Sequence, residues 1–298
     1  IVGFELDSIT YDETRYLNAH IDYKTRAAGG PFIEHLSRLP GYPEGVYKDF
    51  NGNGIIALAD DSIHSVKILV KDTYGNSSVL EFTIRRGFLQ GKGFRNSVVT
   101  NHDAQEFQPG FVNIFESEDL QVILPQEAIY DSFAFVHSKK IATSANAYSP
   151  IFSVESGLVP VQSNFKIRIK ADKPIPQALQ DKMLIKRSWG EKTEVVKASG
   201  DGDWFTGSFK TFGNFELISD DEPPIITGGF HENANLSKSS SIYFVPKDNN
   251  EEIKNFRAEL DGNWLLFTND KGRTFIYKFD EHCIGGSHEL KISVEDEA

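Results

Sequence analysis

The chain has few of the residues that cross-link small proteins, since its 298 residues include one cysteine, Cys283. A single cysteine excludes an intrachain disulfide and a cluster of thiolate metal ligands, so packing alone must hold the fold together. No apolar run reaches the length of about 18 residues that a membrane-spanning helix needs. We therefore expect no transmembrane segment.

Basic residues are also scarce relative to acidic ones. The chain has 31 Lys and Arg against 43 Asp and Glu, a formal net charge of −12. An excess of negative charge works against binding to a nucleic-acid backbone or an anionic membrane surface. Hydrophobic residues make up 39% and aromatic residues 12%, which is enough for globular domains with packed cores.

Apolar and polar residues alternate with a period of two in several segments, which is typical of half-buried strands. Residues 66–70 and 80–84 alternate on either side of the turn-forming segment 72–76, and we expect an antiparallel hairpin there. The same alternation occurs in residues 120–124, 165–169, 275–279 and 290–294. Short strands separated by turn residues predict an all-β protein of tandem immunoglobulin-like β-sandwich domains with few short helices.

Helical patterns are rare. Residues 12–26 carry acidic residues at the start and basic residues at the end, an order that suits the dipole of one helix. A turn or two of helix is also expected after Pro176, because proline is tolerated in a first helical turn. Neither segment changes the prediction of an all-β fold.

Two segments favour domain boundaries. Residues 86–93 lose the strand pattern, and Pro223-Pro224 cannot lie within a central strand. We therefore predict β-sandwich domains at residues 1–88, 89–220 and 221–298. Residues 1–6 resemble a late strand, so the first domain is expected to lack N-terminal strands. The last is expected to be truncated, since the chain ends where a turn should follow.

The sharpest local motif begins at Asp49. Asp49, Asn51, Asn53 and Asp60 occupy positions one, three, five and twelve of a calcium-loop template, with glycine at position six. The last ligand is not the usual glutamate, and the flanking residues favour strands over helices. We therefore interpret the segment first as an Asn-Gly hairpin turn and second as a calcium site.

No pattern points to a catalytic centre. The eight histidines form no His-x-His or His-Glu-x-x-His motif, and no nucleophile elbow, phosphate loop or dinucleotide fingerprint is present. Residues 201–203 and 248–252 are acidic segments that we interpret as solvated turns. Trp189, Trp204 and Trp264 could stack on a glycan, although large aromatic residues in sandwiches more often lie in the core.

The order of several segments resembles the non-catalytic region downstream of the peptidase domain in Gram-negative bacterial proteins of the lysostaphin-like zinc metallopeptidase family. The segments are 12–24, 39–41, 54–56 and 70–76, followed by 130–133, 180–182, 204, 211–215, 222–224 and 260–264. The resemblance spans nearly the whole chain, and residues 12–24 are its most specific part.

Members of that family cleave murein cross-links with a zinc ion held by a His and Asp pair and a His-x-His. None of these ligands matches a position here, so the resemblance implies a region without enzyme activity and without its own zinc or other cofactor. Zinc would be bound only by a peptidase domain upstream of Ile1. The implied partners are an envelope protein or peptidoglycan, in the periplasm or at the cell surface.

Several functions stay open. The chain could position a murein peptidase or dock on envelope partners. It could instead be a scaffold subunit of an outer-membrane assembly without peptidase activity. A third alternative is a carbohydrate-binding or adhesion module, which an exposed Trp189 or Trp204 would favour.

Overall fold

The computed structural model describes residues 11–41, 54–87, 105–229, 231–250, 253–270 and 273–296. Strands dominate, and the helices among these residues are short: α1 (Tyr11–Asn18), α2 (Tyr23–Ala27) and the 3-10 helix η1 (Gln177–Lys182). The prediction of an all-β, sandwich-rich protein with few short helices is confirmed. The structure contains no helix, within the described residues, with the length and apolar character needed to cross a membrane.

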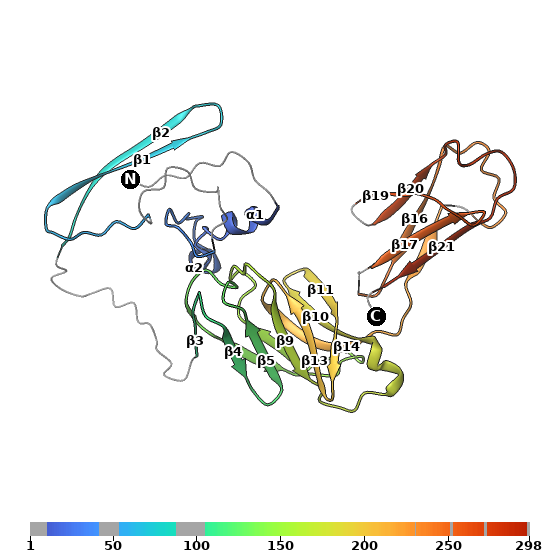
Figure 1. Ribbon diagram of the computed structural model, residues 1–298, viewed down its shortest axis with the longest axis horizontal. Helices are drawn as coiled ribbons and strands as arrows, with labels where there is room; N and C mark the ends of the chain where they lie inside the picture. The colour runs from blue at the N-terminus through green and yellow to red at the C-terminus, as the bar shows by residue number, and fades with distance from the viewer. Residues whose placement is uncertain are drawn as a thin grey trace. The chain divides into compact units, whose positions relative to one another are not determined.

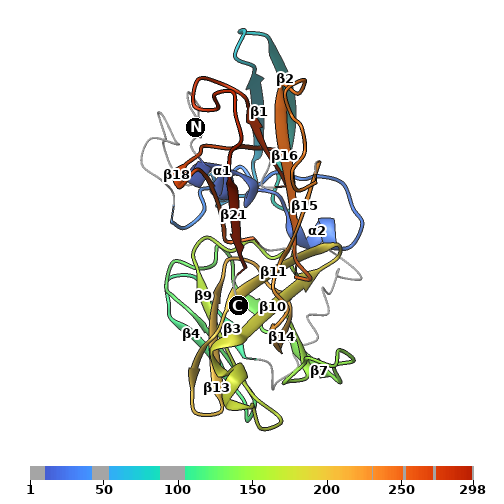
Figure 2. The same ribbon diagram turned by 90° about the vertical axis from the view of Figure 1, so that its right-hand side faces the viewer.

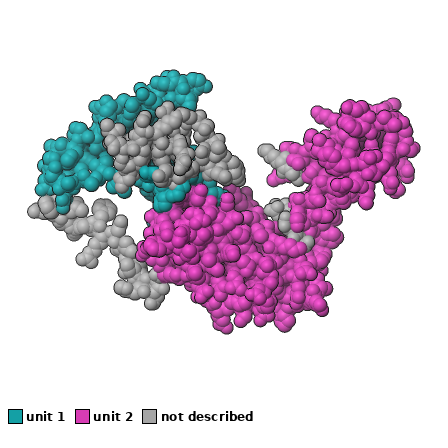
Figure 3. Space-filling view, in the orientation of Figure 1, with its two compact units in different colours: residues 1–104 teal, residues 105–298 magenta. Residues whose placement is uncertain are grey.

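The chain divides into two compact units, residues 1–104 and 105–298 (Figure 3). The described part of the first unit contains α1, α2 and a two-stranded sheet of β1 (Ile63–Lys71) and β2 (Ser77–Arg85). Residues 1–10 and 88–104, which include the predicted late strand and most of the first predicted boundary, lie outside the described residues. The predicted sandwich at residues 1–88 stays a prediction.

The single helix predicted over residues 12–26 is wrong in one respect, because the chain forms two helices. α2 starts anew after Asp22, whose carboxylate accepts hydrogen bonds from the backbone N–H groups of Lys24 and Thr25, each at 3.1 Å. The N–H of Asp22 in turn donates to the carbonyl of Ile33 at 2.8 Å. An N-cap residue has extended backbone dihedrals, so Asp22 cannot continue the helical conformation of α1, which ends at Asn18, and it begins α2 instead.

The predicted hairpin is confirmed. β1 and β2 pair antiparallel with Val66 opposite Phe82, and Asp72 organises the turn between them. The Asp72 carboxylate accepts hydrogen bonds from the backbone N–H groups of Tyr74 and Asn76, both at 2.9 Å. The side-chain amide of Asn76 donates a further hydrogen bond to this carboxylate at 2.7 Å. All of these bonds favour the charged carboxylate and so lower the pKa of Asp72, and the bond from the Asn76 side chain has the largest effect.

The central sandwich, defined here as residues 105–220, contains two five-stranded antiparallel sheets and one short pair, β3 with β6 (Figure 1). Its strands are β3 (Glu106–Phe107), β4 (Asn113–Glu116), β5 (Leu120–Leu124), β6 (Phe133–Ala134), β7 (His137–Lys140), β8 (Ile151–Val154), β9 (Phe165–Lys170), β10 (Met183–Trp189), β11 (Lys192–Lys197), β12 (Ser199–Asp201), β13 (Trp204–Phe209) and β14 (Gly213–Ser219). The sheet orders are β11-β10-β14-β8-β7 and β12-β13-β9-β5-β4. β5 and β9 confirm the strands predicted from alternation, and η1 confirms the helical turn after Pro176.

Aromatic side chains from both sheets fill the core of the central sandwich. Phe165 of β9 and Phe209 of β13 belong to one sheet, and Phe215 of β14 belongs to the other. The ring centroid of Phe215 lies 6.3 Å from that of Phe165 and 5.0 Å from that of Phe209. All three rings are shielded from solvent. Edge-to-face contacts of this kind add to the free energy gained by burying apolar area, so they join the two layers.

A buried arginine connects β10 to the start of β14. Arg187 is 5% exposed, and its Nε and Nη2 donate to the carbonyl oxygen of Phe212 at 2.9 and 2.7 Å. Its Nη1 lies 3.9 Å from the carboxylate of Glu194. Gly213 follows with a φ of 148°, and a Cβ there would lie 2.7 Å from the carbonyl oxygen of Ser188. Only glycine fits this position, because the positive φ disfavours other residues and because a side chain would collide with the Ser188 carbonyl.

The C-terminal sandwich, defined here as residues 225–295, has a four-stranded sheet, β15-β16-β20-β19, and a three-stranded sheet, β18-β17-β21 (Figure 2). Its strands are β15 (Ile225–Gly228), β16 (Ser241–Lys247), β17 (Asn255–Leu260), β18 (Asn263–Trp264), β19 (Thr268–Asp270), β20 (Thr274–Lys278) and β21 (Leu290–Glu295). Pro223-Pro224 precedes β15 and lies outside any strand, as predicted, while the division of the chain into three domains stays a prediction.

The core of the C-terminal sandwich also joins its two sheets. Phe256 of β17 stacks on Phe275 of β20 with ring centroids 3.9 Å apart. Ala258, Leu265 and Tyr277 are buried in the same cluster. The alternation that predicted strands at residues 275–279 and 290–294 is thus explained by one face of each strand contacting this cluster.

Candidate functional site

The predicted calcium loop is described only in part. Asp49, Asn51 and Asn53 lie outside the described residues, whereas Asp60 is exposed in the turn before β1. The Asp60 carboxylate accepts hydrogen bonds from the backbone N–H of Ser62 at 2.9 Å and from the Ser62 hydroxyl. These bonds, the hydroxyl one most, lower the pKa of Asp60. Asp60 therefore has a local role in the turn, and calcium binding by the four residues stays a prediction.

Asp60, Ser62 and His64 lie together, but they lack the geometry of a catalytic triad. His64 Nε2 lies 3.0 Å from Asp60 Oδ1 and 3.4 Å from the hydroxyl oxygen of Ser62. In a triad the imidazole uses one nitrogen for the carboxylate and the other for the nucleophile. Here one nitrogen faces both groups, and the hydroxyl of Ser62 donates a hydrogen bond directly to the carboxylate of Asp60. The three residues form a turn network.

A second carboxylate–imidazole pair connects two loops of the C-terminal sandwich. His288 Nδ1 lies 2.7 Å from Asp261 Oδ2, and His288 Nε2 lies 2.7 Å from the carbonyl oxygen of Ile284. An imidazolium can donate to both acceptors at once, whereas neutral imidazole can donate to only one. The pKa of His288 is accordingly raised, first by Asp261 and then by the Ile284 carbonyl. Asp261 also accepts from the N–H of Glu289 at 2.8 Å, so the pair closes a loop.

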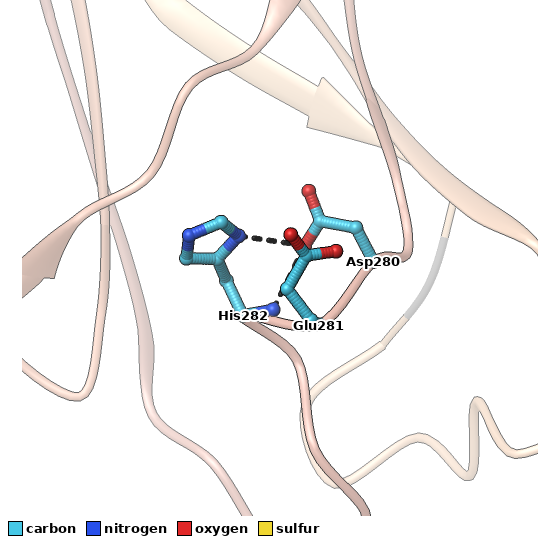
Figure 4. Close-up of side chains that lie close together, drawn as sticks. All are labelled: Asp280, Glu281 and His282. Atoms are coloured by element: carbon cyan, nitrogen blue, oxygen red, sulfur yellow. Dashed lines mark hydrogen bonds and ion pairs between the residues drawn. The ribbon is translucent and has the colours of Figure 1, made fainter.

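The third pair belongs to the one group of potential metal ligands found among the described residues, Asp280, Glu281 and His282 (Figure 4). One ligand atom from each lies within 4.8 Å of the others, and all three residues are exposed. Asp280 Oδ1 accepts hydrogen bonds from the His282 N–H at 3.0 Å, from His282 Nδ1 at 3.1 Å and from the Tyr277 hydroxyl. Three consecutive exposed residues, of which Asp280 and His282 already bond to each other, do not make the closed set of ligands of a structural zinc site.

Asp280 and Tyr277 perturb each other's titration. The hydroxyl of Tyr277, followed by the N–H of His282, lowers the pKa of Asp280. Burial, together with the Asp280 carboxylate, raises the pKa of Tyr277 to about 12. The pair therefore holds an ionised carboxylate at a fixed position at neutral pH. Cys283 follows as a free, half-buried thiol.

A cleft of about 550 Å³ lies beside this carboxylate. Its aromatic and polar lining comes from β18, β19, β20 and the segment after β20: Trp264, Thr268, Tyr277, Lys278, Asp280 and His282. Leucine and isoleucine side chains line the remainder. This volume is in the range typical of small-molecule sites, about 300–1,000 Å³, and the combination of apolar walls with a few polar groups is also typical of them.

Trp264 faces the cleft because of the alternation along its segment. The chain passes from β18 in one sheet to β19 in the other through residues 265–267. Leu265 and Phe267 are buried in the core, whereas Trp264 and Leu266 are 60% and 64% exposed. Neighbouring residues of an extended segment point to opposite sides, so placing Leu265 and Phe267 inward directs Trp264 outward.

The other two tryptophans have structural surroundings. Trp189 is half-buried against Gly157, where an added Cβ would lie 2.5 Å from the indole ring. Trp204 is half-buried, and the guanidinium of Arg168 lies 5.4 Å from the centroid of its ring. Neither is the exposed residue that the carbohydrate-binding alternative required of them. The exposed tryptophan is Trp264, which the burial of its neighbours at 265 and 267 could have indicated.

A buried aspartate receives the loop between β16 and β17. Asp220 is 2% exposed and accepts hydrogen bonds from the side-chain amides of Asn249, at 3.1 Å, and Asn250. Asn250 is buried too, whereas Asp248 is half-buried and Asn249 is exposed, so the solvated turn predicted for residues 248–252 is, in its described part, a turn with one buried side chain. Burial, and then the charges of Asp220 and Asp296, raise the pKa of Asp248. In its described residues, the loop is therefore held in place by hydrogen bonds to Asp220.

Comparison with known proteins gives one family match. The sequence profile of the Zu5-like domain family matches residues 105–220, which are the residues of the central sandwich. No curated protein matches the chain. The match concerns this one domain, and the cleft lies outside the matched residues.

Proposed function

We propose that this chain is a non-catalytic interaction region of a cell-envelope protein related to murein metallopeptidases. It would position a peptidase on its substrate or dock on an envelope partner, in the periplasm or at the cell surface. The murein and envelope context is supported by the motif order across residues 12–264. The Zu5-like match at residues 105–220 concerns one sandwich and is independent of that order.

The observation that carries the proposal is that three carboxylate–histidine pairs of the described residues lie at turns or loops. The described residues pair Asp60 with His64, Asp261 with His288 and Asp280 with His282, and each pair stabilises its own turn or loop. A hydrolytic site needs a nucleophile or metal-bound water next to a base in a cleft. Pairs committed to loops favour a protein that binds over one that catalyses.

The architecture supports binding as well. Edge strands β15 and β7 are exposed along their whole length, and each has an unpaired side. Sandwich proteins bind partners through such edges and through the loops at the ends of their sheets. The lysines at positions 139 and 140 in β7 are the kind of charged residue that discourages edge-to-edge aggregation.

Sedimentation with purified murein sacculi, combined with an assay for release of dye-labelled fragments, tests the proposal. We expect the chain to sediment with sacculi and to release no dye, with or without added zinc. Release of soluble fragments would overturn the non-catalytic assignment. Absence of sedimentation would overturn the murein assignment, and a scaffold subunit without a murein ligand would then be the better explanation.

A further inference from the structure

The cleft of the C-terminal sandwich combines an aromatic surface with fixed hydrogen-bonding groups, and nothing in the turn networks uses this surface. We propose that the cleft binds a saccharide, with one sugar ring stacked on Trp264 and its hydroxyls bonded to Asp280, Lys278 and His282. The assignment depends on the proposed function only for the choice of amino sugar as the first ligand to test.

Trp264 provides the stacking surface. Its side chain is 60% exposed in a sandwich whose other large aromatic residues mostly pack in the core. A sugar ring has one or two faces of C–H groups that fit an aromatic face, and its hydroxyls remain free at the ring edge. Tryptophan offers the largest such face among the side chains, and its N–H can donate a further hydrogen bond.

Asp280 provides a preorganised acceptor. The hydrogen bonds from Tyr277 and His282 all end on Oδ1, and Oδ2 has no hydrogen-bond partner among the described residues. An ionised carboxylate oxygen is a strong acceptor for a hydroxyl, and holding it in place beforehand reduces the entropy lost on binding. Lys278, which also lines the cleft, adds a donor for ring and hydroxyl oxygens, and His282, whose Nδ1 bonds to Asp280, offers Nε2 as an acceptor for a hydroxyl.

Other ligand classes fit the cleft less well. A purely apolar ligand would leave the carboxylate and the lysine without partners while removing them from water. A metal ion that used Asp280 Oδ1 or His282 Nδ1 would have to displace the hydrogen bonds that these atoms already make. A peptide strand needs an open row of backbone groups. β20 is hydrogen-bonded on both sides, and the edge strands β18 and β19 have only two and three residues to pair with.

Fluorine NMR of the full chain labelled with 5-fluorotryptophan tests the proposal, because the three tryptophans give three reporters. We expect chitotetraose, cellotetraose or both to shift the Trp264 signal saturably in the millimolar range and to leave the Trp189 and Trp204 signals in place. Trp264→Ala should weaken binding by about tenfold or more, measured by calorimetry. Asp280→Asn keeps the shape of the side chain and should weaken binding by a smaller factor.

Tyr74→Ala is the matched control, since Tyr74 is an aromatic residue that is 92% exposed in the turn between β1 and β2. It should bind the oligosaccharides as the unchanged chain does. No shift of the Trp264 signal with either oligosaccharide, or equal shifts of all three signals, would overturn the saccharide assignment. Sedimentation with sacculi that survives such a result would leave the proposed function standing, so the two failures are distinguishable. Binding of cellotetraose alone would support the cleft and contradict the preference for an amino sugar.

Discussion

The central and C-terminal sandwiches follow the same plan at two sizes. The central sandwich has five strands in each main sheet and buries a continuous set of aromatic rings between them. The C-terminal sandwich has four and three strands, and the buried cluster among its described residues contains five side chains. A smaller domain shields a smaller share of its apolar surface, so more of that surface remains at its edges.

This difference in size explains where a ligand cleft can form. In the C-terminal sandwich the chain crosses from β18 to β19 at the edge of the two sheets, and the crossing places Trp264 outside the core. In the central sandwich the corresponding large aromatic residues, Trp189 and Trp204, are half-buried against the domain itself. The larger sandwich packs its tryptophans partly against itself, whereas the smaller one leaves most of the Trp264 side chain in solvent.

The largest expected effect comes from removing a ring at the centre of the central sandwich. Phe215→Ala should lower the free energy of unfolding by about 3–5 kcal/mol, because it removes buried apolar area and leaves a cavity between the sheets. Urea unfolding followed by the fluorotryptophan signals measures this, since Trp189 and Trp204 report on the central sandwich and Trp264 on the other. Phe111→Ala, at a ring that is 63% exposed, is the control and should change little.

The same experiment tests whether the two sandwiches differ in stability. The two sandwiches are distinct in stability only when the Phe215→Ala transition moves for Trp189 and Trp204 more than for Trp264. An equal displacement of all three signals would show one cooperative unit, and the contrast between a stable and a binding sandwich would lose its energetic basis.

A smaller loss is expected when the buried arginine is replaced. Arg187→Met keeps much of the aliphatic stem but leaves the Phe212 carbonyl without its two donors, which should cost about 1–3 kcal/mol. Arg257→Met is the matched control, because Arg257 is exposed and its bond to Glu259 lies in solvent. Urea midpoints that fall equally for the two variants would contradict a structural role for the buried guanidinium.

The sequence predicted those elements whose signals are local. Alternation located β5, β9 and β21, and the Gly75-Asn76 signal in the segment 72–76 located the turn between β1 and β2. The helix prediction missed the break at Asp22, because a cap depends on one carboxylate turning back to two N–H groups and the charge order of the segment does not encode it. Local patterns thus predict the existence of a strand or helix better than the residues at which it begins and ends.

The cleft could not be predicted from local patterns. Its residues come from β18, β19, β20 and the segment that follows, and they meet only because β19 pairs with β20 while β18 belongs to the other sheet. Asn250, in the acidic segment 248–252, shows the same limit, since its burial depends on Asp220, which is about thirty residues earlier in the chain. Residues that meet through strand pairing carry no short-range signal.

The pH dependence of stability should distinguish the C-terminal sandwich. The folded state raises the pKa of His288 above its usual value near 6.5, so protonation favours folding. This stabilisation is fully present below about pH 6.5 and is lost as the pH rises through the raised folded pKa. The Trp264 transition should therefore move to higher urea on going from about pH 8 to about pH 5.5.

Asp261→Asn removes the anionic partner of His288 and should flatten that dependence. The lowered pKa of Asp261 itself matters only in more acidic solution, where its carboxylate takes up a proton. Direct titration of the His288 ring by proton NMR should give a pKa above that of an unfolded histidine. A ring that titrates below it would remove the basis for this difference between the sandwiches.

The smallest expected effect is at Trp264. Trp264→Ala should change the free energy of unfolding by no more than about 0.5 kcal/mol, because most of the side chain is already in water. Leu265→Ala, one residue later, should cost about 2–5 kcal/mol, since Leu265 is 6% exposed in the core cluster. The Trp264 signal is absent from the first variant, so both are compared by far-ultraviolet circular dichroism during urea unfolding. A large loss at Trp264 would mean that the indole supports the fold, and the cleft would then have no aromatic surface to spare for a ligand.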